Sequence, residues 1–293
     1  MDKGNETDLI ECRFLDDGYF QRLHDAFTEA FSDYVIPFAL TEIQFRNHLN
    51  LTGVDLTRTV GCIEDARLIG FTLNGFGDWE GRPTVYDAGT GVVPDQRRRG
   101  VSESMFEMML PTFRKAGVEQ CLLEVITTNT GAINLYEKLG FQKIRRLALL
   151  QCDRKVNDSL ENRPAIEIRE IEIPDWNQLE SFWDGKPSWQ NSIDAVTRSQ
   201  GMRRILGAFE AGKCVGYIVF SPKFGRIAQI AVSKYHRKRG IGTALVRAVQ
   251  NETADGFSMQ VINIDTSLSE AMGFFINRGF YERLNQHEMV KSI

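Results

Sequence analysis

Residues 91–100 read GVVPDQRRRG, and residues 231–240 read AVSKYHRKRG. Each stretch combines an apolar strand end, a polar turn, a cluster of basic residues and a closing glycine. The second stretch lies 140 positions after the first, and LYEKLGF at 135–141 is matched by FFINRGF at 274–280 at nearly the same displacement. Two landmarks with one displacement indicate a duplicated unit.

The segments around these landmarks predict the same order of elements in both halves. A strand, a helix and a two-stranded meander precede each basic stretch, and a helix, a strand and a second helix follow it. The first helix after the basic stretch is expected to end at Gly117 or Gly256, and Pro111 is expected to kink or shorten the first copy. The other expected segments are 10–15, 19–31, 59–76, 120–126 and 131–139 in the first half, and 165–171, 175–182, 204–220, 257–264 and 269–278 in the second.

This order predicts an α/β protein of α+β character, in which each half forms a mixed sheet covered by helices. A chain of 293 residues is long enough for two compact domains. We place an N-terminal domain at 1–155 and a C-terminal domain at 164–293, joined by the polar stretch DRKVNDSLENRP at 153–164.

Charge and hydropathy argue against several classes of partner. The chain has 35 Lys and Arg against 39 Asp and Glu, and the net charge of −4 disfavours nucleic acid as a partner. No apolar run approaches the length of a membrane helix, and the polar N-terminus, MDKGNETDLI, does not resemble a secretion signal. We therefore expect a cytoplasmic protein, monomeric or homodimeric, that acts on a small molecule and has no nucleic-acid or membrane partner.

Cysteine and histidine show no metal-binding pattern. The five cysteines have no C-x-x-C spacing, and most lie in apolar, strand-like runs, which predicts buried reduced thiols. The four histidines share no ligand spacing, so no metal site is expected.

The basic stretches have the composition of an anion-binding turn. Residues 237–242 read RKRGIG, and glycines in a strand-to-helix turn let backbone amides converge on an anion at the positive end of the helix. A pyrophosphate fits such a turn. The pattern recurs as RRRGVS at 97–102 before the same order of elements, which favours anion binding over a solvated basic turn.

These motifs resemble those of the GNAT acyltransferase superfamily, whose acetyl-CoA loop reads Q/R-x-x-G-x-G/A and whose later helix often carries a tyrosine before a Gly-Phe pair. The resemblance covers both halves, so that nearly the whole chain is similar to bacterial tandem GNAT proteins. It implies a splayed mixed sheet in each half, with acetyl-CoA (coenzyme A) bound beside the fourth strand. The residues that the resemblance assigns to this cofactor are Gly91, Val92, Val93, Arg97, Arg98, Arg99, Gly100, Val101, Ser102, Asn129 and Asn134 in the first half and Arg237, Gly240 and Gly242 in the second.

The same resemblance implies acetyl transfer to a primary amine by direct attack. The site must then remove a proton from the amine, stabilise an oxyanion and protonate the departing thiolate. Tyr136 occupies the general-acid position of the family. The backbone amides of Gly91 and Val92 are candidates to polarise the carbonyl group. Glu124 and Asp87 stay open as alternatives for the base.

The second half lacks the groups that this chemistry needs. Phe275 stands at the position of Tyr136, and Asn263 stands at the position of Glu124. A phenyl ring cannot donate a proton. We therefore assign the chemistry to the N-terminal domain and a supporting, non-catalytic role to the C-terminal domain.

The acceptor is expected along residues 30–45, a segment that borders the substrate in this family. Phe31, Tyr34 and Phe38 are its aromatic candidates, and Asp87 is a further candidate contact. The acidic balance of the first half, a net charge of −6 over the first 160 residues, mildly favours a cationic amine. Two alternatives remain open, namely a non-catalytic acyl-CoA-binding protein with the same fold and a transferase of a longer acyl group.

Overall fold

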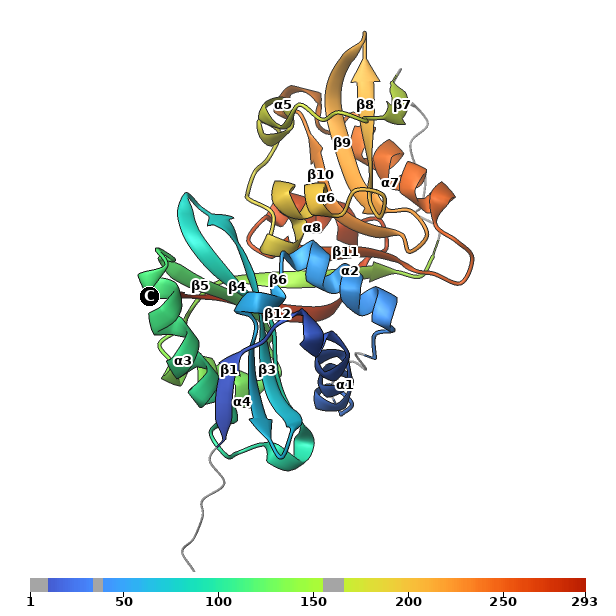
Figure 1. Cartoon of the computed structure of the whole chain (residues 1–293). Coiled ribbons are helices and arrows are strands. Elements are labelled where there is room, and N and C mark those ends of the chain that lie inside the picture. The colour runs from blue at the N-terminus through green and yellow to red at the C-terminus, as the bar shows by residue number, and fades with distance from the viewer. Residues whose placement is uncertain (1–9, 34–38, 155–165) are drawn as a thin grey trace, which may run out of the picture. The chain divides into compact units, whose positions relative to one another are not determined.

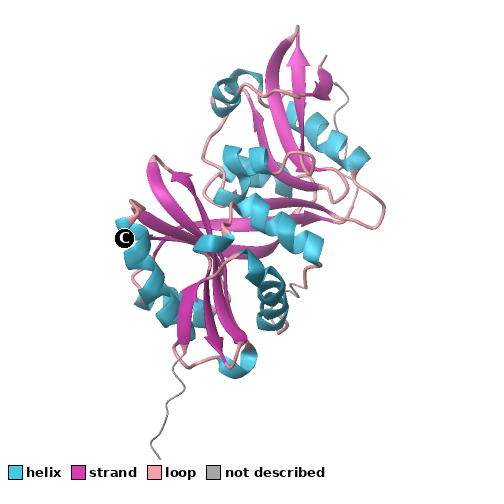
Figure 2. Ribbon diagram, in the orientation of Figure 1, coloured by secondary structure: helices cyan, strands magenta, loops and turns pink. Residues whose placement is uncertain are grey.

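The computed structural model describes residues 10–33, 39–154 and 166–293. The chain forms two compact units (Figure 1). The first unit contains the residues up to Ile144 together with Glu288–Ile293, and the second contains Arg145–His287. Each unit is built on a mixed β-sheet that helices cover (Figure 2).

The sheet of the first unit begins with an antiparallel meander. Its strands are β1 (Glu11–Phe14), β2 (Val60–Glu64), β3 (Arg67–Trp79) and β4 (Arg82–Val92), and β5 (Gln120–Ile126) is added parallel to β4. A two-residue turn joins β3 directly to β4, because Glu80 and Gly81 both adopt the left-handed conformation that such tight hairpins require.

Helices pack into two separate cores of the first unit. They are α1 (Phe20–Ala30), α2 (Glu42–Thr52), α3 (Val101–Lys115) and α4 (Thr130–Lys138). Phe27 of α1 and Phe45 of α2 pack on Phe71 of β3, whereas Phe106 of α3 packs with Val85 of β4 in the other core. The apolar spacing of each helix therefore buries one stripe against the sheet.

The second unit repeats this arrangement. Its meander consists of β7 (Glu167–Glu170), β8 (Arg204–Glu210), β9 (Lys213–Ser221) and β10 (Arg226–Val232), and β11 (Met259–Asp265) is parallel to β10. Its helices are α5 (Trp176–Glu180), α6 (Ile193–Arg198), α7 (Ile241–Glu252) and α8 (Ser269–Ile276).

The last strand of each sheet comes from the other half of the chain. β6 (Gln142–Cys152) follows the first repeat in sequence, yet its residues 147–152 pair with β11 of the second unit. β12 (Tyr281–Ser292) ends the second repeat, yet Met289 is fully buried in the first unit, in the core of α3 and α4. The Ile293 N–H group also donates to the Glu119 carbonyl (2.9 Å). At these two strands the compact units depart from the expected division into 1–155 and 164–293.

Two details differ from expectation. α3 continues past Pro111 to Lys115, so the expected shortening does not occur; Pro111 lies on the exposed side, where the Glu107 carbonyl that loses its helical donor can bind water. Cys12 and Cys62 are not reduced thiols, because the pairing of β1 with β2 places them directly opposite each other and they form a disulfide.

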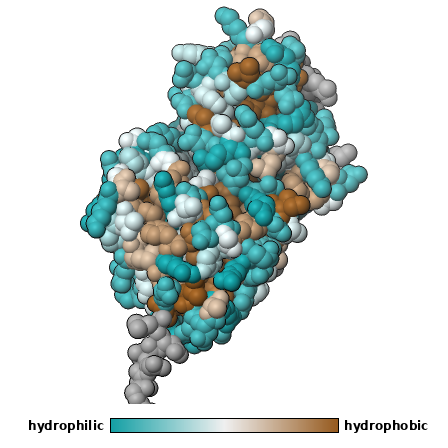
Figure 3. Space-filling model, viewed as in Figure 1, coloured by the Kyte–Doolittle hydropathy of each residue, from teal (hydrophilic) through white to brown (hydrophobic). Residues whose placement is uncertain are grey.

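Two of the remaining three cysteines agree with the expected buried thiols. Cys121 and Cys152 are buried free thiols, and Cys214 is partly exposed. The visible face mixes hydrophilic side chains with apolar patches (Figure 3). In the part of the chain that the structure describes, no helix has the length and apolar character needed to cross a membrane.

Candidate active site

The turn between β4 and α3 presents backbone amides that no side chain of the described residues caps. A 3₁₀ turn at Pro94–Gln96 follows β4, and Arg98 (φ +65°) and Gly100 (φ +80°) then adopt the left-handed conformation. α3 begins after Gly100 without a side-chain cap, whereas Asn129 caps α4 by accepting from the Ala132 N–H group (3.1 Å). The first turn of α3 is therefore open to an external acceptor such as a phosphate.

Two of the three arginines in this turn bind carboxylates of the protein itself. Arg97 folds back and donates to Asp33 (2.7 and 2.8 Å) and to carbonyl groups at the ends of α1 and β4. Arg99 donates to Glu64 (2.7 and 3.0 Å). These hydrogen bonds lower the pKa of both carboxyl groups. Arg98, at the left-handed corner, is exposed.

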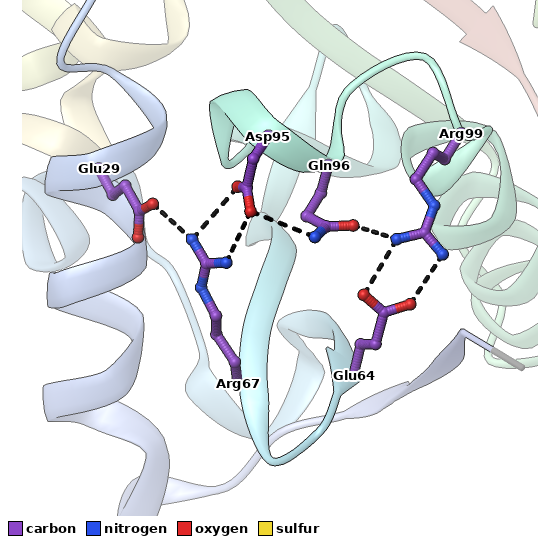
Figure 4. A network of polar contacts seen from close by, with 6 residues as sticks. All are labelled: Glu29, Glu64, Arg67, Asp95, Gln96 and Arg99. Atoms are coloured by element: carbon purple, nitrogen blue, oxygen red, sulfur yellow. Dashed lines mark hydrogen bonds and ion pairs between the residues drawn. The ribbon is translucent and has the colours of Figure 1, made fainter. Parts of the chain in front are cut away.

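The Arg99 pair belongs to a longer polar network, which Figure 4 shows. Arg67 of β3 joins Glu29 of α1 (2.5 Å) to Asp95 of the turn (2.9 Å). Gln96 then bridges Asp95 and Arg99, which completes the network at the hairpin between β2 and β3. Exposed pairs contribute little individually. Together they hold the turn against α1 and the hairpin.

The turn between β10 and α7 has the same construction. Lys238 (φ +60°) and Gly240 (φ +83°) are left-handed, and α7 begins without a side-chain cap. Arg237 donates to the last carbonyl of β10 (3.0 Å), as Arg97 does to that of β4, and Arg239 pairs with Glu210 of the β8–β9 hairpin. The duplication thus extends to individual hydrogen bonds.

In the first unit, β4 and β5 separate close to this turn. Their paired register ends at Asp87 opposite Leu123, and a bulge follows at Ala88. Gly91 has no room for a side chain, because a Cβ atom there would lie 2.6 Å from the Phe71 ring. The amides expected to polarise the carbonyl group, those of Gly91 and the next residue, lie beyond the point of separation.

Tyr136 and Asp87 meet where the strands separate. The Tyr136 hydroxyl donates to Asp87 Oδ2 (3.3 Å), the Thr90 hydroxyl donates to the same oxygen (2.8 Å), and the Gly89 N–H group donates to Oδ1 (3.0 Å). Tyr136 and Asp87 are both buried. Burial raises the pKa of Asp87 to about 6, although the three hydrogen bonds act in the opposite direction.

The other expected site residues of the first unit have varied surroundings. Glu124 is half-buried on β5, and Asn134 is exposed on α4. Phe31 packs on an aromatic ring of α1. Tyr34 and Phe38 lie outside the described residues. Among the expected cofactor contacts, the structure buries Val93 and Val101 in the core and leaves Ser102 half-buried.

The second unit has a cavity of about 590 Å³ beside its turn. It lies where β10 and β11 separate, since their paired register ends at Ile227 opposite Val261. Gly240 and Gly242 line it together with residues of α8, among which Phe275 is fully buried.

A chain of neutral hydrogen bonds lies along this cavity, and sequence reasoning missed it. The Trp183 indole donates to Tyr217, whose hydroxyl donates to Gln229 (2.7 Å), and Gln229 donates to the Asn191 carbonyl. Burial raises the pKa of Tyr217, which keeps it protonated. These residues come from four separate segments, so no local pattern could have joined them.

A sequence profile described as the acetyltransferase (GNAT) family matches residues 20–141 and 165–284, one match in each repeat. The chain belongs to this family.

Curated relatives match only parts of the chain. The [ribosomal protein bS18]-alanine N-acetyltransferase of Escherichia coli K12 is 42% identical over 57 residues, which are 19% of this chain and 38% of that protein. An N-alpha-acetyltransferase of Sulfurisphaera tokodaii is 28% identical over 98 residues, which are 30% of this chain and 59% of that protein. The chain thus spans less than two thirds of the length of these relatives.

Solved GNAT structures match over nearly the whole chain. A tandem GNAT protein from the clavulanic acid biosynthesis pathway has a TM-score of 0.72 at 14% identity, covering 96% of this chain and 98% of that chain. A GCN5-related N-acetyltransferase from Sphaerobacter thermophilus has a TM-score of 0.70 at 17% identity, covering 97% and 95%. At these identities the likeness shows the fold, a tandem of two GNAT units.

Proposed function

We propose that the protein is an acetyl-CoA-dependent N-acetyltransferase whose chemistry takes place in the first unit. The observation that carries this proposal is that the buried Tyr136 hydroxyl lies beside Asp87, where β4 separates from β5, and that β4 leads into the uncapped start of α3. Membership of the GNAT family supports acyl transfer, and the names of the curated relatives, both N-acetyltransferases, favour an amino group as acceptor.

The residues present fit a coenzyme A thioester as the acyl donor. The first-turn amides of α3, at the positive end of the helix, suit its pyrophosphate, and the exposed Arg98 adds positive charge. Arg97 and Arg99 act indirectly in this proposal, because their guanidinium groups hold the turn. The donor supplies an acyl carbon that its thioester activates.

In this proposal, residues of the first unit accept or donate each proton and stabilise the developing charge. Glu124 accepts a proton from the acceptor nitrogen, directly or through water. The backbone amide of Val92, which the antiparallel register with β3 leaves facing away from that strand, donates to the developing oxyanion, whereas Gly91 stands at a hydrogen-bonded position opposite Phe71. Tyr136 donates its phenolic proton to the departing thiolate. The products are an amide and a thiol.

We propose a primary amine of a small molecule as the acceptor. Two carboxylates near the expected acceptor segment are neutralised within the protein, Asp33 by Arg97 and Glu42 by Arg46. These pairs weaken the local argument for a cationic substrate. The proposal therefore specifies the reacting group and leaves the rest of the acceptor open.

For the second unit we propose acyl-CoA binding without turnover. Thr243 in the first turn of α7 accepts from Arg278 (2.6 and 3.0 Å), whereas Glu103 occupies the equivalent position of α3 and pairs with Lys138. A carboxylate at a helix start competes with a phosphate for the same amides, so the second turn is the better anion site. Phe275 offers no acid at the position of the tyrosine.

Two measurements test this assignment. Thiol release from acetyl-CoA across a panel of primary amines tests the activity. Calorimetry with coenzyme A on Gly100→Val and Gly240→Val tests the two turns, because valine is strained in the left-handed conformation at either position. We expect Gly100→Val to lose turnover and the first-unit binding site. We expect Gly240→Val to lose the second-unit site and keep turnover.

The opposite result for the two variants would place the chemistry in the second unit. Coenzyme A binding without thiol release for any amine would favour the non-catalytic alternative. Faster turnover with a longer acyl-CoA than with acetyl-CoA would favour the longer acyl group.

A further inference from the structure

Asp87 has a position in the site that the proposed mechanism does not use. The residue is 5% exposed and stands at the last position of β4 that pairs with β5. It accepts from Gly89, Thr90 and Tyr136. The contact with Tyr136 matters most, because Tyr136 is the proposed general acid and has a single proton to give.

The phenolic proton cannot serve two acceptors at once. The Tyr136 oxygen lies 3.3 Å from Asp87 Oδ2, and an ionised carboxylate at this position can only accept the phenolic proton. A proton held in this way is not available to a leaving thiolate. When Oδ2 itself carries a proton, it donates to the Tyr136 oxygen, and the phenolic O–H bond turns away from Asp87.

The second unit gives an independent indication that these two residues act together. The position of Asp87, 140 residues later, holds Ile227, which is fully buried, and the position of Tyr136 holds Phe275. The carboxyl and hydroxyl groups are present together in one unit and absent together from the other. A buried carboxyl group that only supported the fold would not need to follow the tyrosine.

We propose that Asp87 is a positioning residue whose protonation switches Tyr136 from a held state to a proton-donating state. This inference rests on the function proposed above, in which Tyr136 protonates the thiolate. In the active form, neutral Asp87 donates to the Tyr136 oxygen, Tyr136 gives its proton to the thiolate, and Asp87 stabilises the phenolate. The proton that Glu124 takes from the amine returns through solvent to Tyr136, so the protons balance.

The burial of Asp87 places this switch near neutral pH, because desolvation raises its pKa to about 6. The pKa values of two other groups on the neighbouring elements are also shifted by burial. Burial lowers the pKa of His48 on α2, whose ring contacts the Ala88 carbonyl (3.1 Å), and raises the pKa of Cys121 on β5 well above its usual value. The unit also has Glu124 on β5, the fully buried Glu288 on β12 and Lys291 on β12 as ionisable groups.

The switch makes the rate fall as the pH rises through the pKa of Asp87. Deprotonation of the amine and of Glu124 has the opposite effect, because both must be deprotonated for attack. The reference pKa of a tyrosine hydroxyl, about 10, lies well above this range. A descending limb of kcat between about pH 6 and about pH 8 is therefore specific to Asp87.

The test is kcat at saturating substrates between about pH 5.5 and about pH 9 for the full chain. In Asp87→Asn, the amide nitrogen donates permanently to Tyr136, and we expect the descending limb to disappear. At pH 8 only roughly 1% of a carboxyl group with a pKa of about 6 is protonated, so this variant should exceed the wild type by at least about tenfold. Thr90→Val removes a hydrogen bond that favours the ionised form and should move the limb to higher pH.

Matched variants separate the possible outcomes. Asp25→Asn, at an exposed position of α1, should keep the wild-type profile. A wild-type profile without a descending limb below pH 8 would overturn the switch, and so would an Asp87→Asn profile that is parallel to the wild type and lower at every pH. If Asp87→Asn does not fold, Thr90→Val provides the test, and a descending limb at the wild-type pH in this variant would also overturn the switch. Full activity of Tyr136→Phe would instead show that the general acid of the proposed function is wrong.

Discussion

Replacing Asp87 with asparagine also tests its surroundings without any enzyme assay. Burial raises the pKa of Asp87 from 3.8 to about 6, so the folded protein binds this proton more tightly than the unfolded chain does. The carboxyl group therefore favours the folded state most strongly below its unfolded pKa, and this contribution is lost as the pH rises through about 6. An asparagine at this position does not titrate.

The size of the effect follows from the two pKa values. A difference of two units corresponds to about 3 kcal/mol over the complete titration. Between about pH 5 and about pH 7.5 the group should remove about 1.4 kcal/mol from the stability of the wild-type first unit. Over this range the stability of Asp87→Asn relative to the wild type should rise by the same amount, about a tenfold change in an equilibrium constant.

Hydrogen–deuterium exchange of the slowest amides in β4 and β5 measures this difference within the first unit. The ratio of variant to wild-type exchange rates at each pH removes the intrinsic pH dependence of exchange. We expect this ratio to fall about tenfold between pH 5 and pH 7.5 for Asp87→Asn and to stay constant for the exposed Asp25→Asn. A ratio for Asp87→Asn that does not change with pH would refute the conclusion that burial controls this carboxyl group.

Two further predictions concern the division of labour and the disulfide. Tyr136→Phe should lower kcat by about 10²–10⁴ with little change in acetyl-CoA affinity, and Phe275→Tyr should add no activity. Steady-state kinetics measure kcat, and calorimetry measures the affinity. An unchanged kcat in Tyr136→Phe, or added activity in Phe275→Tyr, would contradict the assignment of the chemistry to the first unit. Cys12→Ser removes a cross-link between residues 50 positions apart, which should cost about 4 kcal/mol of stability in the chain-entropy model. Unfolding of the wild type with and without reductant checks this value, and insensitivity to reductant would contradict it.

Most elements within each repeat could be predicted from sequence because their signals are local, but the helices α2 and α6 were not predicted. β5 occupies the predicted segment 120–126, and α4 begins and ends within one residue of the predicted 131–139. The exchange of β6 and β12 could not be predicted in this way. The alternation of apolar and polar residues in each strand is compatible with either sheet. Which sheet the strand joins depends on the tertiary path of the chain.

The residue types of the site followed from its motifs, but their contacts did not. Arg97 and Arg99 were expected to contact the cofactor, and their partners Asp33 and Glu64 lie 64 and 35 positions away in the chain. Contacts at such separations depend on how the helices and hairpins pack, which a basic turn does not encode. The disulfide was missed for the same reason, because only the register of β1 with β2 brings its two cysteines together.

The two units share the geometry that suits an anion and differ in the groups that suit proton transfer. Both have a left-handed corner, an arginine folded onto the preceding strand and an uncapped helix start. Only the first unit has Asp87 beside Tyr136, where desolvation of the carboxyl group acts against stability by about 3 kcal/mol at neutral pH. The second unit avoids this cost with Ile227 and Phe275. A buried charge that the fold itself does not need, placed on the one hydroxyl expected to give up a proton, is best explained by the chemistry of the first unit.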